Sequence, residues 1–396
     1  MFVFLMKVLF VANRIPYPPY RGDKLKIYNL AKQLCKANEL HLITFYVSDE
    51  ELNYKDELLK VFSSVKLIKQ AKLTSIFWCF MGIFSQIPFQ VLYFKNLKFA
   101  KKLKLLLKNN RYDAIHVQHL RMAQYFKNQA WSKMSILDLP DAFSLYWKRR
   151  IDKSKNQFDR FFAKIEYKRL LSYEQRMLDF KLNLVCSKED MHYLQSVHKI
   201  KNIALLPNGV DVNTFAFSTV SFISNRILFT GNMDYAPNID GAVYFVQEIL
   251  PLIRKKMPKV EFVIAGQRPV SKIQELATES IKVTGFIANL NEMYASACVV
   301  VSPLRIGAGT QNKVLESMSM GVPVVCSQIG FEGLQIANGE GVFMETTAQG
   351  FANRVLDILA DPVLRERMGK QASALILAKF SWETIAQTLT HYFESK

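Results

Sequence analysis

The chain has 396 residues, half of them hydrophobic, and a formal net charge of +18 at pH 7. This length and apolar content exclude a disordered chain and predict a folded protein of two or three domains. The five cysteines are scattered and form no Cys-x-x-Cys pair, which argues against a disulfide framework and favours a reducing compartment.

The positive charge lies in the first half of the chain. Residues 1–205 contain 36 Lys and Arg against 17 Asp and Glu, whereas residues 206–396 contain 16 against 17. A field of this kind attracts a polyanion or an anionic membrane surface. Because the sequence has no recognition motif for nucleic acid, we expect a membrane surface and no nucleic acid among the partners.

The first half alternates short apolar runs with helical patterns. The apolar start is too short to cross a bilayer and lacks the features of a signal peptide, so we expect a cytoplasmic protein. A loop with three prolines, residues 13–22, precedes a helix at 23–37, and two further helices are predicted within 139–179. Strands are predicted at residues 7–12, 40–45, 65–68, 114–117, 135–137 and 182–186. This alternation predicts a parallel sheet with helices on both faces.

One segment of this half is unusual in its polarity. Residues 75–94 are almost uncharged and rich in Phe, Trp and Ile, and residues 95–108 read as an amphipathic helix of lysines and leucines. Together they predict a patch at a membrane interface, at the inner face of the cytoplasmic membrane. The alternative is a buried helix followed by a solvated one.

The second half repeats the alternation after the turn sequence at residues 207–211. We therefore predict an N-terminal domain of residues 1–206, a C-terminal domain of residues 207–380, and a terminal helix, 381–396, that can pack back on the first domain. Strands are predicted at 226–230, 260–265, 281–284 and 299–301, and helices at 238–256, from 271, at 290–297, within 348–379 and at 382–393. The fold class is thus α/β with two doubly wound domains, and a ligand is expected where the carboxyl ends of the two sheets face one another.

A glycine loop near the end of the second half carries the clearest chemistry. Residues 299–325 have the order strand, loop, helix, strand, and the loop Gly307–Thr310 leads into a helix predicted at residues 311–320. A helix start offers unpaired N–H groups and a positive dipole end, and glycines let an anion approach them closely. The pattern predicts a phosphate-binding loop.

Two charged side chains share one face of that helix. Lys313 and Glu316 are three residues apart, which places a cation near the loop and a carboxylate deeper along the helix. A carboxylate suits the two vicinal hydroxyls of a ribose. The alternative is an ordinary surface ion pair on a helix.

These patterns resemble the family 4 glycosyltransferases of the GT-B fold, and within them a bacterial sugar-transferase subgroup linked to exopolysaccharide and exosortase gene clusters. The resemblance covers nearly the whole chain and is stronger in the second half. The motifs that carry it are PNGVD at residues 207–211, GNMDYAPNID at 231–240, PLRI at 303–306, QNKVLE at 311–316 and LLSYEQR at 170–176.

The resemblance implies a nucleotide-sugar site and retention of anomeric configuration. Glu316 would bind the ribose, Lys313 would lie by the diphosphate, and Ile287 would hold the base through its backbone. The donor-binding residues predicted in this way are Gly22, Gly231, Asn232, Arg268, Ile287, Gly307, Gly309, Thr310, Gln311 and Glu316. No metal or other cofactor is expected, because the chain has no Asp-x-Asp triplet to hold a Mg²⁺-bridged diphosphate.

The sequence also departs from the usual family pattern. Ala308 stands where a first glutamate is usual, eight positions before Glu316, and Asn232 and Asn238 lie where an Arg and a Lys are usual. The missing phosphate charge would come from Lys313, Arg305 or Arg268, and we favour Lys313 and Arg305 as catalytic residues because they flank the helix start. The alternative for Arg268 is an exposed turn residue.

The first half supplies candidates for the acceptor. Asp141 follows a predicted strand and is assigned as a third catalytic residue that orients the acceptor or the sugar, with helix capping as its alternative. The candidates for acceptor binding are Arg14, Arg21, Lys24 and His116. A solvated basic loop and a structural histidine are the alternatives for these.

The leading hypothesis is a hexosyltransferase that moves a sugar from a UDP or GDP donor to a lipid-linked or surface-glycan acceptor without metal. A nucleotide-sugar epimerase of the same fold would need no acceptor. A catalytically degenerate binding module would bind the donor without releasing free nucleotide. A dehydrogenase is disfavoured because the first loop lacks the Gly-x-Gly-x-x-Gly fingerprint.

Overall fold

The computed structural model describes residues 6–127, 130–154, 156–217, 223–307 and 309–395. The chain divides into two compact units, the first comprising Met1–Pro207 with Ile385–Lys396 and the second Asn208–Thr384. Each unit contains one sheet, and all strand pairs in both sheets are parallel. The predicted α/β class with two parallel sheets is confirmed.

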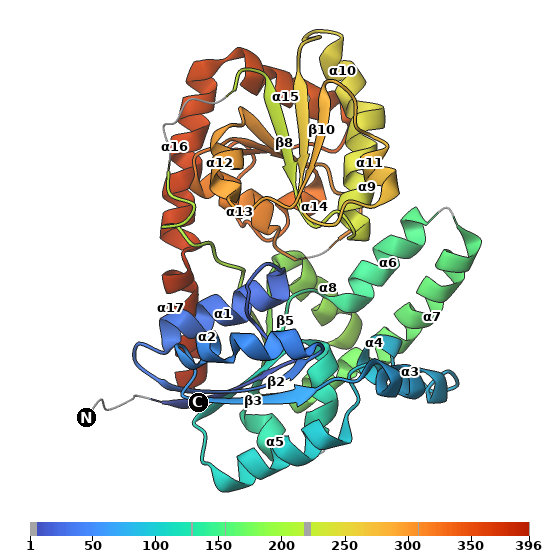
Figure 1. The fold of residues 1–396 in the computed structure, drawn as a ribbon, viewed down its shortest axis with the longest axis vertical. Helices are drawn as coiled ribbons and strands as arrows, with labels where there is room; N and C mark the ends of the chain where they lie inside the picture. Colours follow the sequence, from blue (N-terminus) through green and yellow to red (C-terminus); the bar gives the residue numbers. More distant parts are fainter. Residues whose placement is uncertain (1–5, 128–129, 155, 218–222, 308, 396) are drawn as a thin grey trace. The chain divides into compact units, whose positions relative to one another are not determined.

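The first sheet has seven strands in the order β3-β2-β1-β4-β5-β6-β7 (Figure 1). Its strands are β1 Lys7–Ala12, β2 Glu39–Tyr46, β3 Ser64–Lys69, β4 Ala114–Gln118, β5 Ser135–Leu139, β6 Leu182–Val185 and β7 Ile203–Leu205. The central β1 pairs with β2 on one side and β4 on the other. The sequence analysis missed β7, a three-residue strand at the sheet edge, because so short a run has no readable period.

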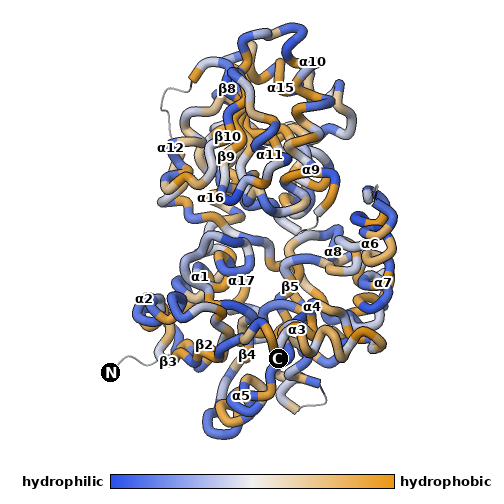
Figure 2. The backbone as a smooth tube through the Cα atoms, turned by 45° about the vertical axis from the view of Figure 1, so that its right-hand side comes forward, coloured by the Kyte–Doolittle hydropathy of each residue, from blue (hydrophilic) through white to orange (hydrophobic). Residues whose placement is uncertain are grey.

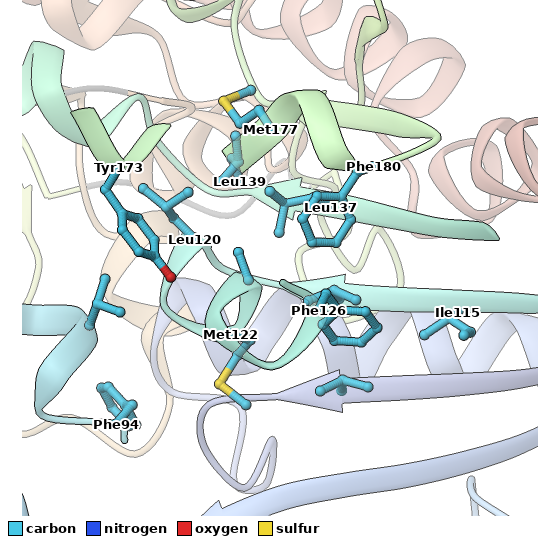
Figure 3. Packing of buried hydrophobic residues seen from close by; sticks show 14 of the residues in the cluster. Phe94, Ile115, Leu120, Met122, Phe126, Leu137, Leu139, Tyr173, Met177 and Phe180 are labelled. Carbon is cyan, nitrogen blue, oxygen red and sulfur yellow. The ribbon is translucent and has the colours of Figure 1, made fainter. Parts of the chain in front are cut away.

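Helices of the first unit follow the strands they connect. They are α1 Gly22–Leu34, α2 Lys55–Leu59, α3 Lys72–Met81, α4 Phe89–Leu92, α5 Leu97–Asn109, α6 Phe143–Lys153, α7 Gln157–Glu174, α8 Lys188–His198 and α17 Trp382–Glu394. The last of these brings the chain end back to the first unit, where the hydroxyl of Tyr392 donates to the carbonyl oxygen of Leu205 over 3.1 Å. Figure 3 shows how Leu137, Phe126 and Phe180 pack together in the core of this unit.

The segment expected to form an interfacial patch contains α3, α4 and α5, of which α3 and α5 differ in burial. Of α3, only Ser75 is buried, so the alternative of a buried helix is wrong there. The helix α5, in contrast, buries Phe99 and Leu103 against the core and points its lysines outward, as an ordinary surface helix does. None of the described helices combines the length and the apolar character that crossing a bilayer requires.

The second sheet has six strands in the order β10-β9-β8-β11-β12-β13. They are β8 Arg226–Thr230, β9 Glu261–Ala265, β10 Ile281–Gly285, β11 Val299–Ser302, β12 Val324–Cys326 and β13 Val342–Met344. The valines of β11 and β12 are fully buried, as both faces of a parallel sheet require, and Figure 2 colours the strands of this sheet as largely hydrophobic. The short edge strand β13 was missed for the same reason as β7.

The helices of the second unit are α9 Ala236–Tyr244, α10 Leu250–Arg254, α11 Ser271–Gln274, α12 Leu290–Ala295, α13 Asn312–Ser319, α14 Gln328–Phe331, α15 Ala348–Ala360 and α16 Pro362–Lys379. The single helix predicted at 238–256 is interrupted by a π-helical turn, Phe245–Ile249. Pro251 follows in the first turn of α10, and since proline has no N–H to donate, the regular helical ladder cannot run through it.

Candidate functional site

The strand order of the second sheet places a ligand site at one position. The connections run outward in opposite directions from β8 and β11, which are neighbours, so the carboxyl ends of these two strands flank a switch point. Ligands of open parallel sheets bind outside the carboxyl ends of strands at such a point. Gly231 and Asn232 follow β8, and the segment from Pro303 to Gln311 follows β11. The predicted donor-binding residues of the second unit therefore converge on the edge where this class of fold binds ligands.

Two glycines let the turns after β8 and β9 pack directly against each other. Gly266 has a φ of 156°, and a Cβ at this position would lie 1.6 Å from the carbonyl oxygen of Gly231. Gly231 has a φ of 155°, and its Cβ would lie 2.6 Å from Nδ2 of Asn238. A larger residue at Gly266 would separate the two turns, and one at Gly231 would displace the side chain of Asn238.

Lys313 sits in the first turns of α13, and its side chain is held inside this edge. Its Nζ donates to Oδ1 of Asn238 over 2.8 Å and lies 4.9 Å from the ring centroid of Phe229. Burial lowers the pKa of this ammonium to about 8, although the charge of Glu316 opposes the shift. Among the described residues, no carboxylate is bonded to this buried ammonium, so its charge can stabilise an incoming anion.

The amide of Asn238 continues this contact into a polar chain. Its Nδ2 donates to the carbonyl oxygen of Asn232 over 3.0 Å, and Oδ1 of Asn232 accepts from Nε2 of Gln267 over 2.7 Å. This series of hydrogen bonds connects α13 with the turns after β8 and β9. It fixes the Lys313 ammonium and the side chain of Asn232 with respect to one another.

Glu316 lies one turn further along α13 and is oriented by a tyrosine. Its Oε2 accepts from the hydroxyl of Tyr294 over 2.7 Å, and that hydroxyl lies 2.9 Å from Oγ1 of Thr230. Tyr294 is fully buried, so its hydroxyl cannot turn to water. Burial raises the pKa of Glu316, while the bond from Tyr294 and the charge of Lys313 oppose the shift. The alternative of a solvated surface pair does not describe Glu316 and Lys313.

The start of α13 is formed by the glycine loop. Gln311 is the N-cap residue, and its side chain makes no capping bond to the first turn. Gly309 has a φ of 72°, in the left-handed region, and Thr310 is buried beside it. Ala308, at the position of the usual first glutamate, lies outside the described residues. Because the first N–H groups of a helix have no partner within the helix, this start can receive an anion.

The two arginines considered as phosphate ligands already have partners. Arg305 forms a two-point pair with Asp240 at 2.9 and 2.5 Å and lies 4.5 Å from the ring centroid of Tyr244. The hydrogen bonds that Arg305 donates to the carboxylate of Asp240 raise the pKa of the guanidinium. Arg268 is half exposed and lies 3.2 Å from the carboxylate of Asp234. Of the three cations proposed for the diphosphate, Lys313 has the least neutralised charge.

The remaining predicted donor residues occupy neighbouring strand ends. Ile287 follows Gly285 at the end of β10 and is half-buried against the apolar cluster that contains Val314. Gly307 has a φ of 146°, and a Cβ there would come within 3.2 Å of Ile329. Both lie at the same edge of the sheet as the start of α13.

In the first unit, His116 belongs to a buried charge cluster rather than to a binding surface. Lys26 donates from Nζ to Oδ1 of Asp138 over 2.7 Å and to the carbonyl oxygen of Leu206 over 2.9 Å. Nε2 of His116 lies 3.2 Å from Oδ2 of the same aspartate. His116 has no exposed surface, so it cannot contact an acceptor, and its assignment to acceptor binding is corrected to a structural role.

That cluster keeps its charges despite burial. Burial would lower the pKa of Lys26, but the carboxylate of Asp138 outweighs it and the pKa is raised. Burial would likewise raise the pKa of Asp138, but Lys26 and His116 hold it low. The cluster ties α1 to β4 and β5 at the carboxyl end of the first sheet, where removal of one partner would leave an unpaired buried charge.

Asp141 lies between β5 and α6 beside a second acid. Burial, together with the charge of Asp190, raises the pKa of Asp141 to about 8. Asp190 accepts from the backbone N–H of Ala142 over 3.2 Å and from the Ser187 hydroxyl over 2.7 Å. Asp141 is therefore mostly protonated at neutral pH and can donate a hydrogen bond to a sugar oxygen as well as accept one.

The basic residues of the proline loop are placed around one carboxylate. Arg14 and Arg21 lie 3.2 and 3.6 Å from Asp23, which is the second residue of α1 after Gly22. Lys24 lies 3.6 Å from the carboxylate of Glu51, and burial lowers its pKa. Burial is also the largest cause of the lowered pKa of Arg14. These side chains form a partly neutralised group rather than a freely solvated loop.

Sequence reasoning missed the residues that orient the two key side chains of α13. Tyr294 lies on α12 and Thr230 at the end of β8, far from Glu316 in the sequence. Asn238 was noted only as standing where a basic residue is usual. No local signal marks such partners, because their roles arise from the packing of α12 and α9 beside α13.

The Tyr294→Phe variant keeps the charge of Glu316 but removes the hydroxyl that orients its carboxylate. Glu316 and Thr230 lose their shared partner, so the free energy of unfolding should fall by about 1–2 kcal/mol and the Kd for nucleotide should rise about five- to tenfold. Urea unfolding and isothermal titration measure the two effects. Tyr244→Phe, under Arg305, serves as the control that should change neither value. Unchanged nucleotide affinity in Tyr294→Phe would show that Tyr294 does not position the carboxylate.

A known family model matches part of the second unit. The family model "Glycosyl transferases group 1" matches residues 224–361, which contain the site from Gly231 to Glu316. A Klebsiella pneumoniae protein, named as an uncharacterized 44.6 kDa protein in the cps region, is 22% identical over 376 residues, which are 89% of this chain and 91% of that protein.

A second relative has a named activity. The GDP-mannose-dependent monoacylated alpha-(1-6)-phosphatidylinositol monomannoside mannosyltransferase of Corynebacterium glutamicum is 25% identical over 212 residues. The match spans 48% of this chain and 56% of the mannosyltransferase, so this chain covers little more than half of that protein's length.

Solved structures define the fold. Sucrose-phosphate synthase of Thermosynechococcus elongatus is similar over 98% of both chains, with a TM-score of 0.71 and 18% identity. The Anabaena protein HepE, solved in complex with UDP and glucose, is similar over 99% of this chain and 100% of that chain, with a TM-score of 0.67 and 14% identity. The chain has the GT-B fold, and the fold prediction is confirmed.

Proposed function

We propose that this protein is a glycosyltransferase that moves a hexose from a UDP or GDP donor to a lipid-linked or surface-glycan acceptor, with retention of anomeric configuration. The observation that carries the proposal is the pairing of a buried ammonium, Lys313, with an oriented carboxylate, Glu316, at a helix start on the switch point of a parallel sheet. A nucleoside diphosphate offers the matching groups, an anionic diphosphate and a diol.

In this proposal the protein stabilises the departing diphosphate with fixed donors. The first N–H groups of α13 and the Lys313 ammonium face the charge that develops as the bond to the sugar breaks. Gly309 and Thr310 line the approach, and Glu316 accepts from both ribose hydroxyls. No metal enters the scheme, and the leaving phosphate assists in deprotonating the acceptor hydroxyl.

The other residues predicted to bind the donor differ in how freely they can contact it. Asn232 lies in the turn after β8, and its side chain accepts a hydrogen bond from Gln267. The neighbouring Gly231 lets the donor approach this turn closely. For Arg305 to reach the diphosphate, its guanidinium must exchange Asp240 for phosphate, so we assign the main charge to Lys313. Arg268 would have to leave Asp234 in the same way.

The first unit supplies the acceptor side of the proposal. Asp141, with its raised pKa, orients the acceptor hydroxyl or the sugar, and Arg14, Arg21 and Lys24 meet anionic groups of the acceptor, while Gly22 belongs to the donor side. Two observations favour a lipid-linked or surface glycan in an exopolysaccharide-type system. One relative lies by its name in a cps region and another acts on a phosphatidylinositol mannoside. The reaction then takes place at the cytoplasmic face of the membrane.

A panel of UDP- and GDP-hexoses, each incubated with and without a polyprenyl diphosphate-linked sugar, tests the proposal. The expected result is free UDP or GDP and a glycosylated lipid, formed only when the acceptor is present. An epimerised donor formed without acceptor would instead indicate an epimerase. Donor binding without nucleotide release with any acceptor would indicate a degenerate binding module, and absence of nucleotide binding would overturn the proposal.

A further inference from the structure

An apolar surface of unusual size lies on the first unit, on α3 and the loop after it. Leu73, Ile76 and Phe80 recur at helical spacing on α3, and Phe84, in the turn after the helix, is 98% exposed. Figure 2 colours much of α3 as hydrophobic. Single exposed apolar residues are normal on protein surfaces, but a contiguous group of this kind marks an interaction site.

The start of α7 carries a second group of exposed rings. Phe158 is 87% exposed and Phe161 is 66% exposed, in the first turns of the helix. The ring of the next residue, Phe162, stacks on Phe89 of α4 with centroids 5.8 Å apart. The segments α3, α4 and α7 thus lie side by side, as Figure 1 also shows. We name as the α3–α7 surface the side chains of Leu73, Ile76, Phe80, Phe84, Phe158 and Phe161.

Buried charges hold this surface in a fixed shape. The carboxylate of Glu166, on α7, accepts from the backbone N–H groups of Phe89 and Gln90 over 3.1 and 3.4 Å. Arg169, one turn later, donates to the carbonyl oxygens of Ile83 and Ile87. Both charged side chains are buried. The loop between α3 and α4 is therefore fastened to α7, and its exposed rings are not the product of a loose segment.

The sequence around α3 is basic, and Nζ of Lys95 lies 3.7 Å from the ring centroid of Trp78 on that helix. From Leu58 to Tyr112 the sequence contains eleven Lys and Arg and no Asp or Glu. On α7, the side chains of Arg160, Lys164 and Lys168 are exposed and lie close in the sequence to Phe158 and Phe161. Apolar side chains that insert at an interface, with cations beside them, match an anionic lipid surface. A second copy of the chain fits less well, because the same cations would meet one another across the contact.

We propose that the α3–α7 surface docks this protein on an anionic bilayer. Its apolar side chains lie in the interfacial layer, and the neighbouring lysines and arginines contact lipid headgroups. This inference rests on the proposed function, which places the reaction at the membrane, and it names the surface of the protein that contacts the lipid. It needs neither Lys313 nor Glu316, so its test is independent of the donor site.

Flotation of the full-length protein with vesicles tests this docking. Vesicles of phosphatidylcholine with about one third phosphatidylglycerol should bind the protein, vesicles of phosphatidylcholine alone should bind it much less, and added salt should weaken binding. The variant Phe80→Ser/Phe84→Ser/Phe158→Ser should lose at least tenfold in partition coefficient. Val363→Ser/Leu377→Ser, which changes two exposed apolar residues of α16, is the matched control and should bind as the parent protein does.

Two further readouts keep the outcome clear. UDP or GDP binding should be equal in the triple variant and the parent, which separates docking from the donor site, and equal thermal unfolding midpoints should show that the first unit of the variant is folded. A Phe84→Trp variant should show a blue-shifted emission with anionic vesicles and quenching by brominated lipid. Equal vesicle binding by the triple variant and the control would overturn the proposal, as would a parent dimer that the triple variant dissociates.

Discussion

The Glu316→Ala variant is expected to bind UDP or GDP at least 100-fold more weakly than the parent protein. The carboxylate accepts from both ribose hydroxyls in our account, and hydrogen bonds to a charged group contribute about 1.5–3 kcal/mol each. The loss is expected in affinity for nucleotide and for nucleotide sugar alike, because the ribose is common to both. Isothermal titration with UDP and GDP measures it.

Two variants make this result specific. Glu316→Gln keeps the volume and one acceptor oxygen and should lose less, about tenfold, since a neutral acceptor bonds more weakly than a charged one. Glu275→Ala removes an exposed carboxylate from the same unit and should have no effect. Because burial raises the pKa of Glu316, affinity in the parent should also fall as the pH drops through that raised pKa. Nucleotide binding by Glu316→Ala equal to that of the parent would refute the assignment of the ribose.

The second large effect is expected in the rate of transfer by the Lys313→Met variant. Methionine keeps the apolar stem against Phe229 but removes the charge that faces the departing diphosphate. Removal of one such fixed donor from an active site lowers kcat by about 100- to 1,000-fold. The matched control is Lys272→Met, at an exposed position on α11. A turnover rate within twofold of the parent would exclude Lys313 from leaving-group stabilisation.

The same lysine predicts the direction of a pH effect. With a pKa of about 8 in the free protein, Lys313 loses its proton as the pH rises above that value. Diphosphate binding must then restore the proton, so affinity should decline by up to about tenfold per pH unit above pH 8. Lys313→Met should bind weakly at all these pH values and lack this decline. A parent affinity that is constant between pH 7 and 9.5 would contradict the assignment.

Much of the fold was readable from the sequence because its parts have strong local signals. Buried strands such as β8 and β11 are short apolar runs between turns, and their alternation with helices determines a parallel sheet. The failures have local causes as well. The strands β7 and β13 are too short to show a period, and Pro251 interrupts a helix whose apolar pattern continues through it.

The site was readable only in part. The glycine loop with Lys313 and Glu316 follows a known pattern within ten residues, whereas Tyr294 reaches Glu316 from another helix. His116 is a residue that the sequence analysis assigned to acceptor binding and that the structure buries completely beside Asp138. Pairing across elements depends on packing, which local spacing does not encode.

A crystal structure of the protein with bound UDP or GDP would test the central claim most directly. We predict that both ribose hydroxyls lie within hydrogen-bond distance of the Glu316 carboxylate, and that the diphosphate contacts the first N–H groups of α13 and Nζ of Lys313. A nucleotide bound away from the carboxyl ends of β8 and β11, with Glu316 still bonded only to Tyr294, would contradict it.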